Sequence, residues 1–353
     1  MFDIYKNKKV LVTGHTGFKG SWLTEWLLEL GSDVIGYALN PISEKDNFVL
    51  ANLINKIKDY REDIRNYSKL YEVVQREEPE IIFHLAAQPL VLESYKNPHY
   101  TFETNTLGTA NILEAFRQAD KARVLVVITT DKVYQNNEWE WGYRENDSLG
   151  ANDPYSASKA ASELIITSYL KSLIDIKEKL IVSVRAGNVI GGGDWADDRI
   201  LPDCIRALEK NEDIIIRNPK STRPWQHVLE PLGGYLLLGE KLLNNKTEFM
   251  GAWNFGPYLS NVISVEELVN FVIEYYGEGK YTIQSLENSF KESNFLSLDI
   301  TKAIKKLNWK PILNINETIE LTVDWYKRYK KENVDKICKE QITAYMKLWK
   351  LNG

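Results

Sequence analysis

Tyr155 and Lys159 are the two residues whose types and spacing most directly suggest chemistry in this chain of 353 residues. Because they are four positions apart, they lie about one turn from each other and share a face if the segment is helical. A nearby ammonium group stabilises a phenolate and lowers the pKa of the phenol, so Tyr155 could act as a base toward a sugar hydroxyl. By itself the pair would be more simply explained as an ordinary surface pair, but two motifs upstream favour the catalytic interpretation.

The first upstream motif is Thr129-Thr130-Asp131-Lys132, which ends the apolar run at 124–128. The carboxyl ends of parallel strands are where open α/β sheets hold their ligands. A hydroxyl, a carboxyl group and an amine in succession could donate a hydrogen bond, act as an acid and act as a base. The alternative is a helix-capping Thr-Asp step followed by a surface lysine, and we would prefer it if Tyr155 and Lys159 were absent.

The second upstream motif is a glycine-rich turn between an expected strand at 10–12 and an expected helix that begins near Ser21. Glycines let the backbone approach a pyrophosphate, and the N-terminus of a helix presents unpaired N–H groups to it. The spacing G-x-x-G-x-x-G departs from G-x-G-x-x-G, and such turns often serve tight packing alone. Because the turn lies directly between an expected strand and an expected helix, it predicts a dinucleotide site. The residues assigned to this site are Gly14, Thr16, Gly17, Phe18, Lys19 and Gly20.

Three further segments bear on the cofactor. The second strand ends at Asn40 with neither an acidic residue for a ribose nor an arginine for a 2′-phosphate, which weakly favours NAD over NADP. Asp63 could accept a hydrogen bond from an adenine amino group, although a solvated pair with Arg65 explains it equally well. The small residues after the strand at 81–85 let a cofactor pass closely, although packing alone could require them. We assign to the cofactor site, together with Tyr155 and Lys159, the residues Asp63, Ile64, Leu85, Ala86, Ala87, Gln88 and Thr129.

Short β-branched runs alternate with helix-length segments through the first half of the chain. Strands are expected at 10–12, 34–39, 81–85, 124–129 and 180–184, and helices at 101–118 and 155–173. The alternation predicts an α/β fold with a doubly wound parallel sheet, a Rossmann domain formed by 1–190 and roughly 228–258.

The segment after Arg185, rich in Gly, Trp, Arg and Pro, is expected to be loop. A strand-like run at 252–255 precedes helical patterns at 265–276, 301–307 and from 318 onward, so 191–227 and 259–353 should form a smaller, partly helical, substrate-binding lobe.

Composition restricts the classes of partner. A net charge of −5 without a long Lys/Arg block makes nucleic acid an unlikely partner. Cys204 and Cys338 have neither a disulfide framework nor metal-ligand spacing, and four scattered histidines add no metal signal, so no metal is expected. The apolar runs are too short to span a bilayer, and the polar N-terminus leads straight into a strand. A cytoplasmic protein without a membrane segment is the expectation.

The motifs T-G-x-x-G-F-x-G and Y-x-x-x-K resemble those of the extended short-chain dehydrogenase/reductases. Longer segments are similar to the family of CDP-glucose 4,6-dehydratases: 129–134 (TTDKVY), 138–145 (EWEWGYRE), 153–159 (DPYSASK), 184–195 (VRAGNVIGGGDW) and 217–231 (RNPKSTRPWQHVLEP). Related nucleotide-sugar dehydratases carry a glutamate at the position of Lys132, so this lysine points to the CDP-glucose branch. Thr130 replaces the commoner serine, and Val133 and Gln135 also depart from the pattern.

The resemblance implies an internal oxidation, elimination and reduction of CDP-D-glucose to CDP-4-keto-6-deoxy-D-glucose, with NAD restored at the end. Tyr155, aided by Lys159 and Thr130, would take the proton of the C4 hydroxyl. Lys132 would then remove the C5 proton and Asp131 would protonate the departing C6 hydroxyl, although the division of labour between these two stays open. The product would serve deoxysugar synthesis for O-antigen-type polysaccharides.

For the substrate, we single out Gln88, Tyr134, Asn188, Arg199, Arg223 and His227. Arginines can fork onto a diphosphate, although salt bridges within a loop-rich lobe would explain any one of them as well. Two helices, at 101–118 and 155–173, carry apolar residues on more than one face, which makes a homodimer or a dimer of dimers plausible.

Two rival functions use parts of the same motifs. An epimerase or reductase would need Tyr155 and Lys159 but would have less use for Asp131 and Lys132. A dinucleotide-sensing module would have no need for a primed phenol, so the intact Tyr155, Lys159 and Thr130 argue against it.

Overall fold

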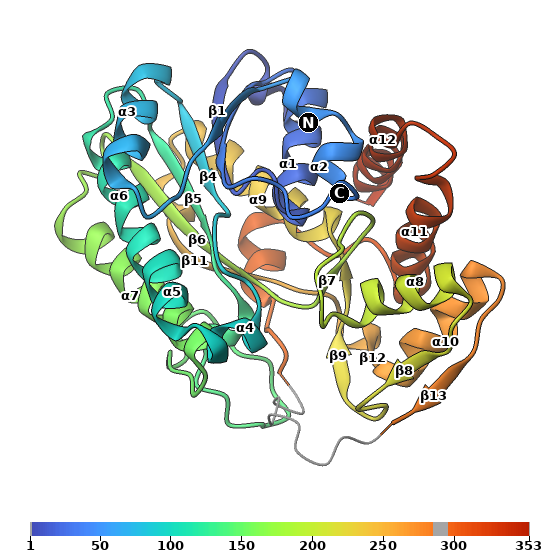
Figure 1. Ribbon diagram of the computed structural model, residues 1–353. Coiled ribbons are helices and arrows are strands. Elements are labelled where there is room, and N and C mark those ends of the chain that lie inside the picture. The colour runs from blue at the N-terminus through green and yellow to red at the C-terminus, as the bar shows by residue number, and fades with distance from the viewer. Residues whose placement is uncertain (1, 285–295, 353) are drawn as a thin grey trace.

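A seven-stranded parallel sheet forms the centre of the molecule, in a computed structural model that describes residues 2–284 and 296–352 (Figure 1). The strand order is β11-β6-β5-β4-β1-β2-β3, and every neighbouring pair is parallel. The bounds are β1 Lys9–Thr13, β2 Asp33–Ala38, β3 Lys58–Arg61, β4 Ile81–His84, β5 Val124–Ile128, β6 Leu180–Ala186 and β11 Gly251–Phe255. The order reverses direction between β1 and β4, the switch point at which such sheets bind ligands.

Helices cover both faces of this sheet because its strands are apolar on both sides. Val10 and Val12 of β1 are buried in one core, and Leu11 between them is buried in the other. The first core packs against α1 (Phe18–Glu29), α9 (Leu229–Leu243) and α12 (Val334–Asn352), and the second against α3 (Tyr67–Glu77), α6 (Gly108–Gln118) and α7 (Pro154–Ser172). The two helical layers lie on either side of the strands in Figure 1. The predicted doubly wound α/β class is confirmed.

A smaller lobe is built from two segments of the chain, one between β6 and α9 and the other between β11 and α12. It contains three short strand pairs: β7 Val189–Ile190 with β10 Gln226–His227, β8 Ile214–Ile216 with β13 Tyr281–Ile283, and β9 Thr222–Pro224 with β12 Val262–Ser264. Its helices are α8 Ile200–Lys210, α10 Val265–Tyr276 and α11 Ile315–Arg328. The final helix, α12, returns to pack against α1 as well as α11. The division of the chain into two domains at the stated residues stays a prediction.

The segment after Arg185, expected to be loop, is the main correction to the sequence analysis. Residues 200–210 form α8, whose buried Leu201, Ile205 and Leu208 repeat at helical spacing. The helical pattern was not recognised in the sequence because the segments on either side are rich in Gly, Trp and Pro. The predicted helix at 101–118 is helical throughout and starts earlier: α5 Pro98–Phe102 continues into α6 through a wider, π-helical turn at Glu103–Leu107. The remaining short helices are α2 Asn47–Leu50 and α4 Val91–Lys96.

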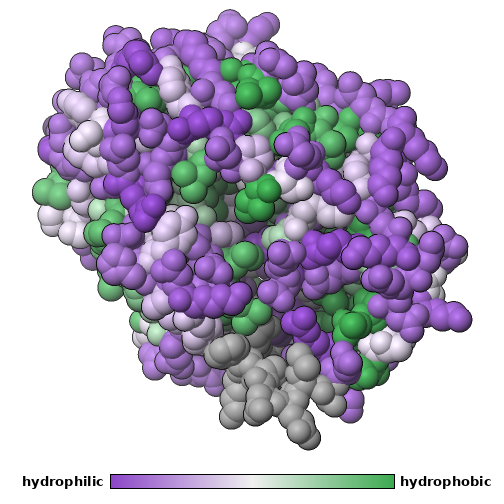
Figure 2. Space-filling model, viewed as in Figure 1, coloured by the Kyte–Doolittle hydropathy of each residue, from purple (hydrophilic) through white to green (hydrophobic). Residues whose placement is uncertain are grey.

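The surface is mainly hydrophilic, with apolar residues gathered toward the middle of the face shown in Figure 2. Within the part of the chain that the structure describes, every helix is too short or too polar to cross a lipid bilayer.

Helix α9 packs tightly because glycines replace side chains where it meets its neighbours. A methyl group on Gly234 would overlap the ring of Phe255 on β11. Gly234→Ala should therefore lower the free energy of unfolding by ~1–3 kcal/mol, because overpacking outweighs the gain in helix propensity. Chemical denaturation measures this. Gly256→Ala is the control, since a methyl group there would meet only Ile300 and Leu298 at 3.7 and 3.8 Å; equal stability losses in both variants would contradict the packing argument.

Candidate active site

Tyr155 and Lys159 lie in the first two turns of α7, beside the carboxyl end of β5. The helix begins where it does because Asp153 accepts a hydrogen bond from the Ser156 N–H at 2.9 Å and Pro154 occupies the first turn. Both features are local and strong, so they fix which residues of α7 face the sheet. The predicted tyrosine and lysine therefore share a buried helical face, with exposed fractions of 8% and 5%.

The environment of this pair shifts both pKa values. Burial raises the pKa of Tyr155 to about 12, while a hydrogen bond with Thr130 and the Arg199 guanidinium act in the opposite direction. Burial lowers the pKa of Lys159 to about 8, and the Glu163 carboxylate counteracts that change. The ammonium of Lys159 also donates to the Ile128 carbonyl at 3.4 Å, which anchors it to the end of β5.

Thr130 and Asp131 are buried next to the tyrosine. The Thr130 hydroxyl donates to Asp131 Oδ1 at 2.9 Å, and Thr130 also caps the short turn that contains Lys132, which is half-buried. A methyl group on Gly187 would overlap the Asp131 carboxylate, so the glycine provides the space that this carboxylate occupies. The structure thus gathers Thr130, Asp131 and Tyr155, as the sequence predicts, and adds Gly187, whose position in the segment 184–195 was its only signal.

Two cations, Lys19 and Arg199, and the Asp194 carboxylate lie close to Asp131 and Tyr155. Arg199 forms an ion pair with Asp194 at 2.8 Å. Burial and the charges of Arg199 and Lys159 lower the pKa of Lys19 to about 8, against the opposing effects of Asp131 and Asp194. Lys19, assigned from sequence to the rim of the cofactor site, therefore lies within electrostatic reach of Asp131. The sequence analysis missed Asp194, although it lies within the segment 184–195.

The glycine-rich turn has the geometry that its spacing predicts. Gly14 has a φ of +74°, and a methyl group there would lie 2.7 Å from the Ala86 nitrogen. A methyl group on Gly20 would overlap the Gly14 carbonyl, so α1 can approach β1 only with glycine at this position. Gly17 precedes α1 without any side-chain cap, which leaves the first N–H groups of the helix to an anion. The turn fits a dinucleotide pyrophosphate.

The other cofactor candidates lie in the turn itself or just after β3, β4 and β5. Asp63 pairs with Arg65 at 2.7 Å, which is the arrangement that the sequence analysis kept as the alternative to adenine binding. Gln88 is buried and bonded to Leu90 and Thr101. The others are placed as follows: Thr16 donates to Leu39 O at 3.1 Å, Phe18 begins α1, Thr129 and Ile64 are buried, and Leu85, Ala86 and Ala87 are half-buried after β4.

The six substrate candidates do not form one exposed group. Asn188, Arg199 and Arg223 are half-buried in the lobe. The side chain of His227 is fully buried, with its ring edge-on to Trp22, and burial lowers its pKa to about 3. Tyr134 and Gln88 are also buried, and the Tyr134 hydroxyl is bonded inside the protein. Asn188, Arg199 and Arg223 are therefore more accessible to a ligand than Gln88, Tyr134 and His227.

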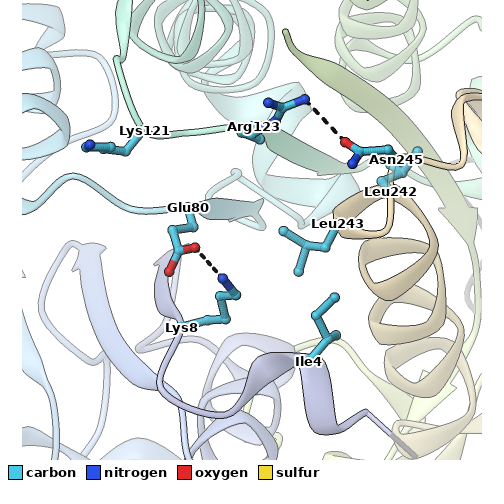
Figure 3. Close-up of a pocket in the computed structure, with 8 residues that line it drawn as sticks. All are labelled: Ile4, Lys8, Glu80, Lys121, Arg123, Leu242, Leu243 and Asn245. Carbon is cyan, nitrogen blue, oxygen red and sulfur yellow. Dashed lines mark hydrogen bonds and ion pairs between the residues drawn. The ribbon is translucent and has the colours of Figure 1, made fainter. Parts of the chain in front are cut away.

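A separate cavity of about 260 Å³ opens at the opposite, amino-terminal edge of the sheet (Figure 3). Its charged side chains have partners within the chain: Lys8 pairs with Glu80 at 2.5 Å, and Arg123 donates to Asn245 at 3.2 Å. Every predicted site residue lies outside its lining, so we do not assign the reaction to this cavity. Among the described residues, no three His, Cys, Asp or Glu side chains are grouped as a metal site requires.

Comparison with known proteins identifies the family of the chain. Residues 11–322 match the family model described as GDP-mannose 4,6 dehydratase. The chain belongs to this family. A CDP-glucose 4,6-dehydratase of Salmonella typhimurium is 43% identical over 350 residues, which are 98% of each chain. A CDP-paratose 2-epimerase of Salmonella typhi is 27% identical over 90% of this chain and 98% of its own. The resemblance drawn from the sequence motifs is thereby confirmed.

Solved structures support the fold of this GDP-mannose 4,6 dehydratase family member. A UDP-glucose 4-epimerase of Thermus thermophilus, in complex with NAD, is 25% identical, with a TM-score of 0.78 over 91% of this chain and 99% of its own. A dTDP-glucose 4,6-dehydratase of Streptomyces venezuelae has a TM-score of 0.78 at 22% identity, over 90% of this chain and 97% of its own.

Gly187→Ala tests the packing of the Asp131 carboxylate in this family member. The added methyl group should push the carboxylate aside and break its hydrogen bond with Thr130, because a buried site has no room to adjust. A crystal structure of the variant measures the displacement, and denaturation should show a loss of ~1–3 kcal/mol in the free energy of unfolding. An Asp131 side chain that keeps its place and its Thr130 bond would contradict the assignment.

Proposed function

We propose that this chain is an NAD-dependent CDP-glucose 4,6-dehydratase that makes CDP-4-keto-6-deoxy-D-glucose. The observation that carries the proposal is the Thr130-Asp131-Lys132 step beside Tyr155 in a chain 43% identical to a CDP-glucose 4,6-dehydratase over 98% of both lengths. Oxidation of the sugar at C4 would need only Tyr155 and Lys159 as protein groups. The adjoining carboxyl group and amine supply the acid and base that an elimination of water needs.

NAD would be held by the glycine turn, with its pyrophosphate at the first N–H groups of α1. Support comes from the close packing at Gly14 and Gly20, which keeps the turn free of side chains, and from the NAD-bound Thermus thermophilus relative. When bound, NAD supplies the oxidising power at the sugar C4 and returns the same hydride to C6. Thr129, Ala86 and Ala87 adjoin the turn and are assigned to this site.

The chain's own residues handle the protons. Tyr155 accepts the proton of the C4 hydroxyl, aided by the Thr130 hydrogen bond and by the positive charge of Lys159. The resulting 4-ketone acidifies the C5 hydrogen, which Lys132 removes. Asp131 must carry a proton for this step: it gives that proton to the C6 hydroxyl, which leaves as water, while the Thr130 hydrogen bond positions the carboxyl group. Lys132 then returns a proton to C5. Before the next turnover Tyr155 releases the C4 hydroxyl proton to solvent and Asp131 takes one up.

The nucleotide end of the substrate is assigned to the lobe. Arg199, Arg223 and Asn188 are half-buried there, and guanidinium groups match the geometry of a diphosphate. Gln88, Tyr134 and His227 complete the substrate assignment, although their side chains are buried.

Three finer assignments accompany this proposal. A 4-keto-6-deoxy nucleotide sugar feeds the synthesis of deoxysugars for surface polysaccharides such as lipopolysaccharide. The unpaired, buried Cys204 and Cys338 suit a reducing cytoplasm. The exposed Leu107 and Leu164, with exposed fractions of 56% and 62%, lie on neighbouring helical segments, where a second copy would cover them in a homodimer.

A screen of CDP-, dTDP-, UDP- and GDP-glucose with NAD tests the reaction and the nucleotide together. We expect mass spectrometry to show loss of one water from CDP-glucose in preference to the others, with a 4-keto, 6-deoxy product. An inverted sugar that keeps its C6 hydroxyl would instead identify an epimerase.

The double variant Asp131→Asn with Lys132→Met separates elimination from oxidation. Dehydration should fall by about 10⁴-fold or more, because each general acid–base group contributes about 10²–10⁴. Oxidation at C4 should persist, since Tyr155 and Lys159 remain, so reduced cofactor should accumulate in its absorbance band. The chain offers a matched control, Asp120→Asn with Lys121→Met, in which the same two changes fall on an exposed turn at the far edge of the sheet. Unchanged product formation in the first variant would place the elimination groups elsewhere.

A further inference from the structure

Glu163 is a fully buried carboxylate on α7, one turn after Lys159, and both of its oxygens are occupied. Oε1 accepts from the Thr129 hydroxyl at 2.6 Å and from Arg185 Nε at 3.0 Å. Oε2 accepts from the Ser183 hydroxyl at 2.9 Å and from Arg185 Nη2 at 2.9 Å. The carboxylate thus joins α7 to the ends of β5 and β6 through four hydrogen bonds.

Arg185 on β6 is as deeply buried as Glu163, at 3% exposed. Besides the two bonds to Glu163, its Nη1 donates to the Tyr134 hydroxyl at 2.7 Å and to the Glu145 carbonyl at 3.0 Å. Burial alone would raise the pKa of Glu163, but Arg185 and the hydroxyl donors Thr129 and Ser183 hold it below its usual value. The pair therefore remains ionised inside the protein.

The network continues from Arg185 into the chain beyond the sheet. The Tyr134 hydroxyl donates to Asn254 Oδ1 at 2.7 Å. The Asn254 amide in turn donates to the carbonyls of Tyr143 at 2.7 Å and Asp299 at 3.2 Å. Tyr134, predicted from sequence to bind substrate, is thus bonded on both sides within this network, which runs from Thr129 at the sheet edge to Asp299.

Such an arrangement is a poor source of stability but a strong geometric constraint. Two buried charges lose their hydration, and a well-packed apolar pair of similar volume is often at least as stable. A fully satisfied network nevertheless fixes the positions of its members. Here the fixed members include Thr129, the neighbour of Thr130, and α7 at the turn that follows Lys159.

Besides Tyr155 on the same helix, three charged or titratable groups interact with Lys159. Glu163 lies on the same helix, His84 on β4 and Lys19 on α1. Burial and the Lys159 charge lower the pKa of His84 to about 3, so the imidazole is neutral, and Lys19 is itself a cation. Glu163 is therefore the anion among these groups that favours the charged form of Lys159.

We propose that Glu163 and Arg185 are a positioning pair for the dehydratase reaction: through hydrogen bonds to Thr129 and across one turn of α7, they hold Thr130 and a charged Lys159 against Tyr155. The proposal rests on the proposed function, because it assigns these residues to the same reaction. Both side chains are buried and hydrogen-bonded within the protein, so we assign them a positioning role only.

Glu163→Gln tests the electrostatic part. Lys159 must be protonated to stabilise the phenolate, so activity falls on the alkaline side as Lys159 loses its proton. Burial holds the pKa of Lys159 at about 8, and removing the Glu163 charge lowers it further. The alkaline limb of kcat/KM should therefore move to lower pH by about 1 unit or more, and kcat should fall about 100-fold with little change in KM.

Glu230→Gln is the matched control, since Glu230 is also buried, at 1% exposed, and accepts from Ile312, Leu313 and Tyr345 far from α7. It makes the same chemical change and should keep the wild-type alkaline limb. An alkaline limb unchanged in Glu163→Gln, or shifted equally in both variants, would overturn the proposal.

Two charge-retaining variants test the positional part and remain informative if Glu163→Gln does not fold. Glu163→Asp shortens the side chain, and Arg185→Lys loses the two-point contact, but both keep the charge. In each, the alkaline limb should stay near that of the wild type while kcat falls about tenfold or more. A wild-type kcat in both variants would overturn the positioning role.

The titration of Lys159 itself can be followed without any substrate. The rate of its acetylation by acetic anhydride, measured by peptide mass spectrometry over a range of pH, rises as the amine loses its proton. The midpoint should be lower in Glu163→Gln than in the wild type and in Glu230→Gln. This readout separates the two proposals, because a shifted midpoint in a chain that does not dehydrate CDP-glucose would contradict the proposed function alone, whereas an unshifted midpoint would contradict the positioning pair.

Discussion

The burial of an ionisable phenol beside a buried amine, at the carboxyl end of β5, is the constraint on which the rest of the site depends. Tyr155 and Lys159 can lie there only because α7 starts at Pro154 with Asp153 as its cap, and because the ends of β5 and β6 meet its inner face. Burial disfavours both charged forms, raising the pKa of Tyr155 and lowering that of Lys159. Arg199 counters that effect on Tyr155, and Glu163 counters it on Lys159.

The polar side chains around Tyr155 and Lys159 are held in place by hydrogen bonds or by close packing. Thr130 bonds to Asp131, and Gly187 leaves the space for that carboxylate. Lys19 and Arg199 bring positive charge from α1 and from the start of α8, where the sheet and the lobe approach each other. A site with this many fixed charges favours an anionic substrate whose charge completes it, as a nucleotide diphosphate sugar would.

The sequence predicts most of the sheet, because runs such as 124–128 are apolar on both faces and have few alternatives to a buried parallel strand. It predicts a third strand before Asp63 but not its bounds, because Lys58–Arg61 are polar and half-exposed. It does not predict α8, whose pattern is hidden by neighbouring glycines and tryptophans. The catalytic candidates could be found because their chemistry and spacing are local. Gly187 and Arg185 could not be assigned roles, because their partners, Asp131 and Glu163, are distant in the sequence. The burial of His227 could not be predicted either, because only tertiary packing decides which side chains of a short strand face the protein interior.

The central claim is that one bound hexose is oxidised at C4 and reduced at C6 without releasing its hydrogen. CDP-glucose carrying deuterium at C4 tests it most directly, with unlabelled water as the solvent and NMR and mass spectrometry of the product. We predict that the deuterium is recovered at C6, with ordinary hydrogen at C5. Deuterium lost to water, or retained at C4 in a dehydrated or inverted sugar, would contradict it.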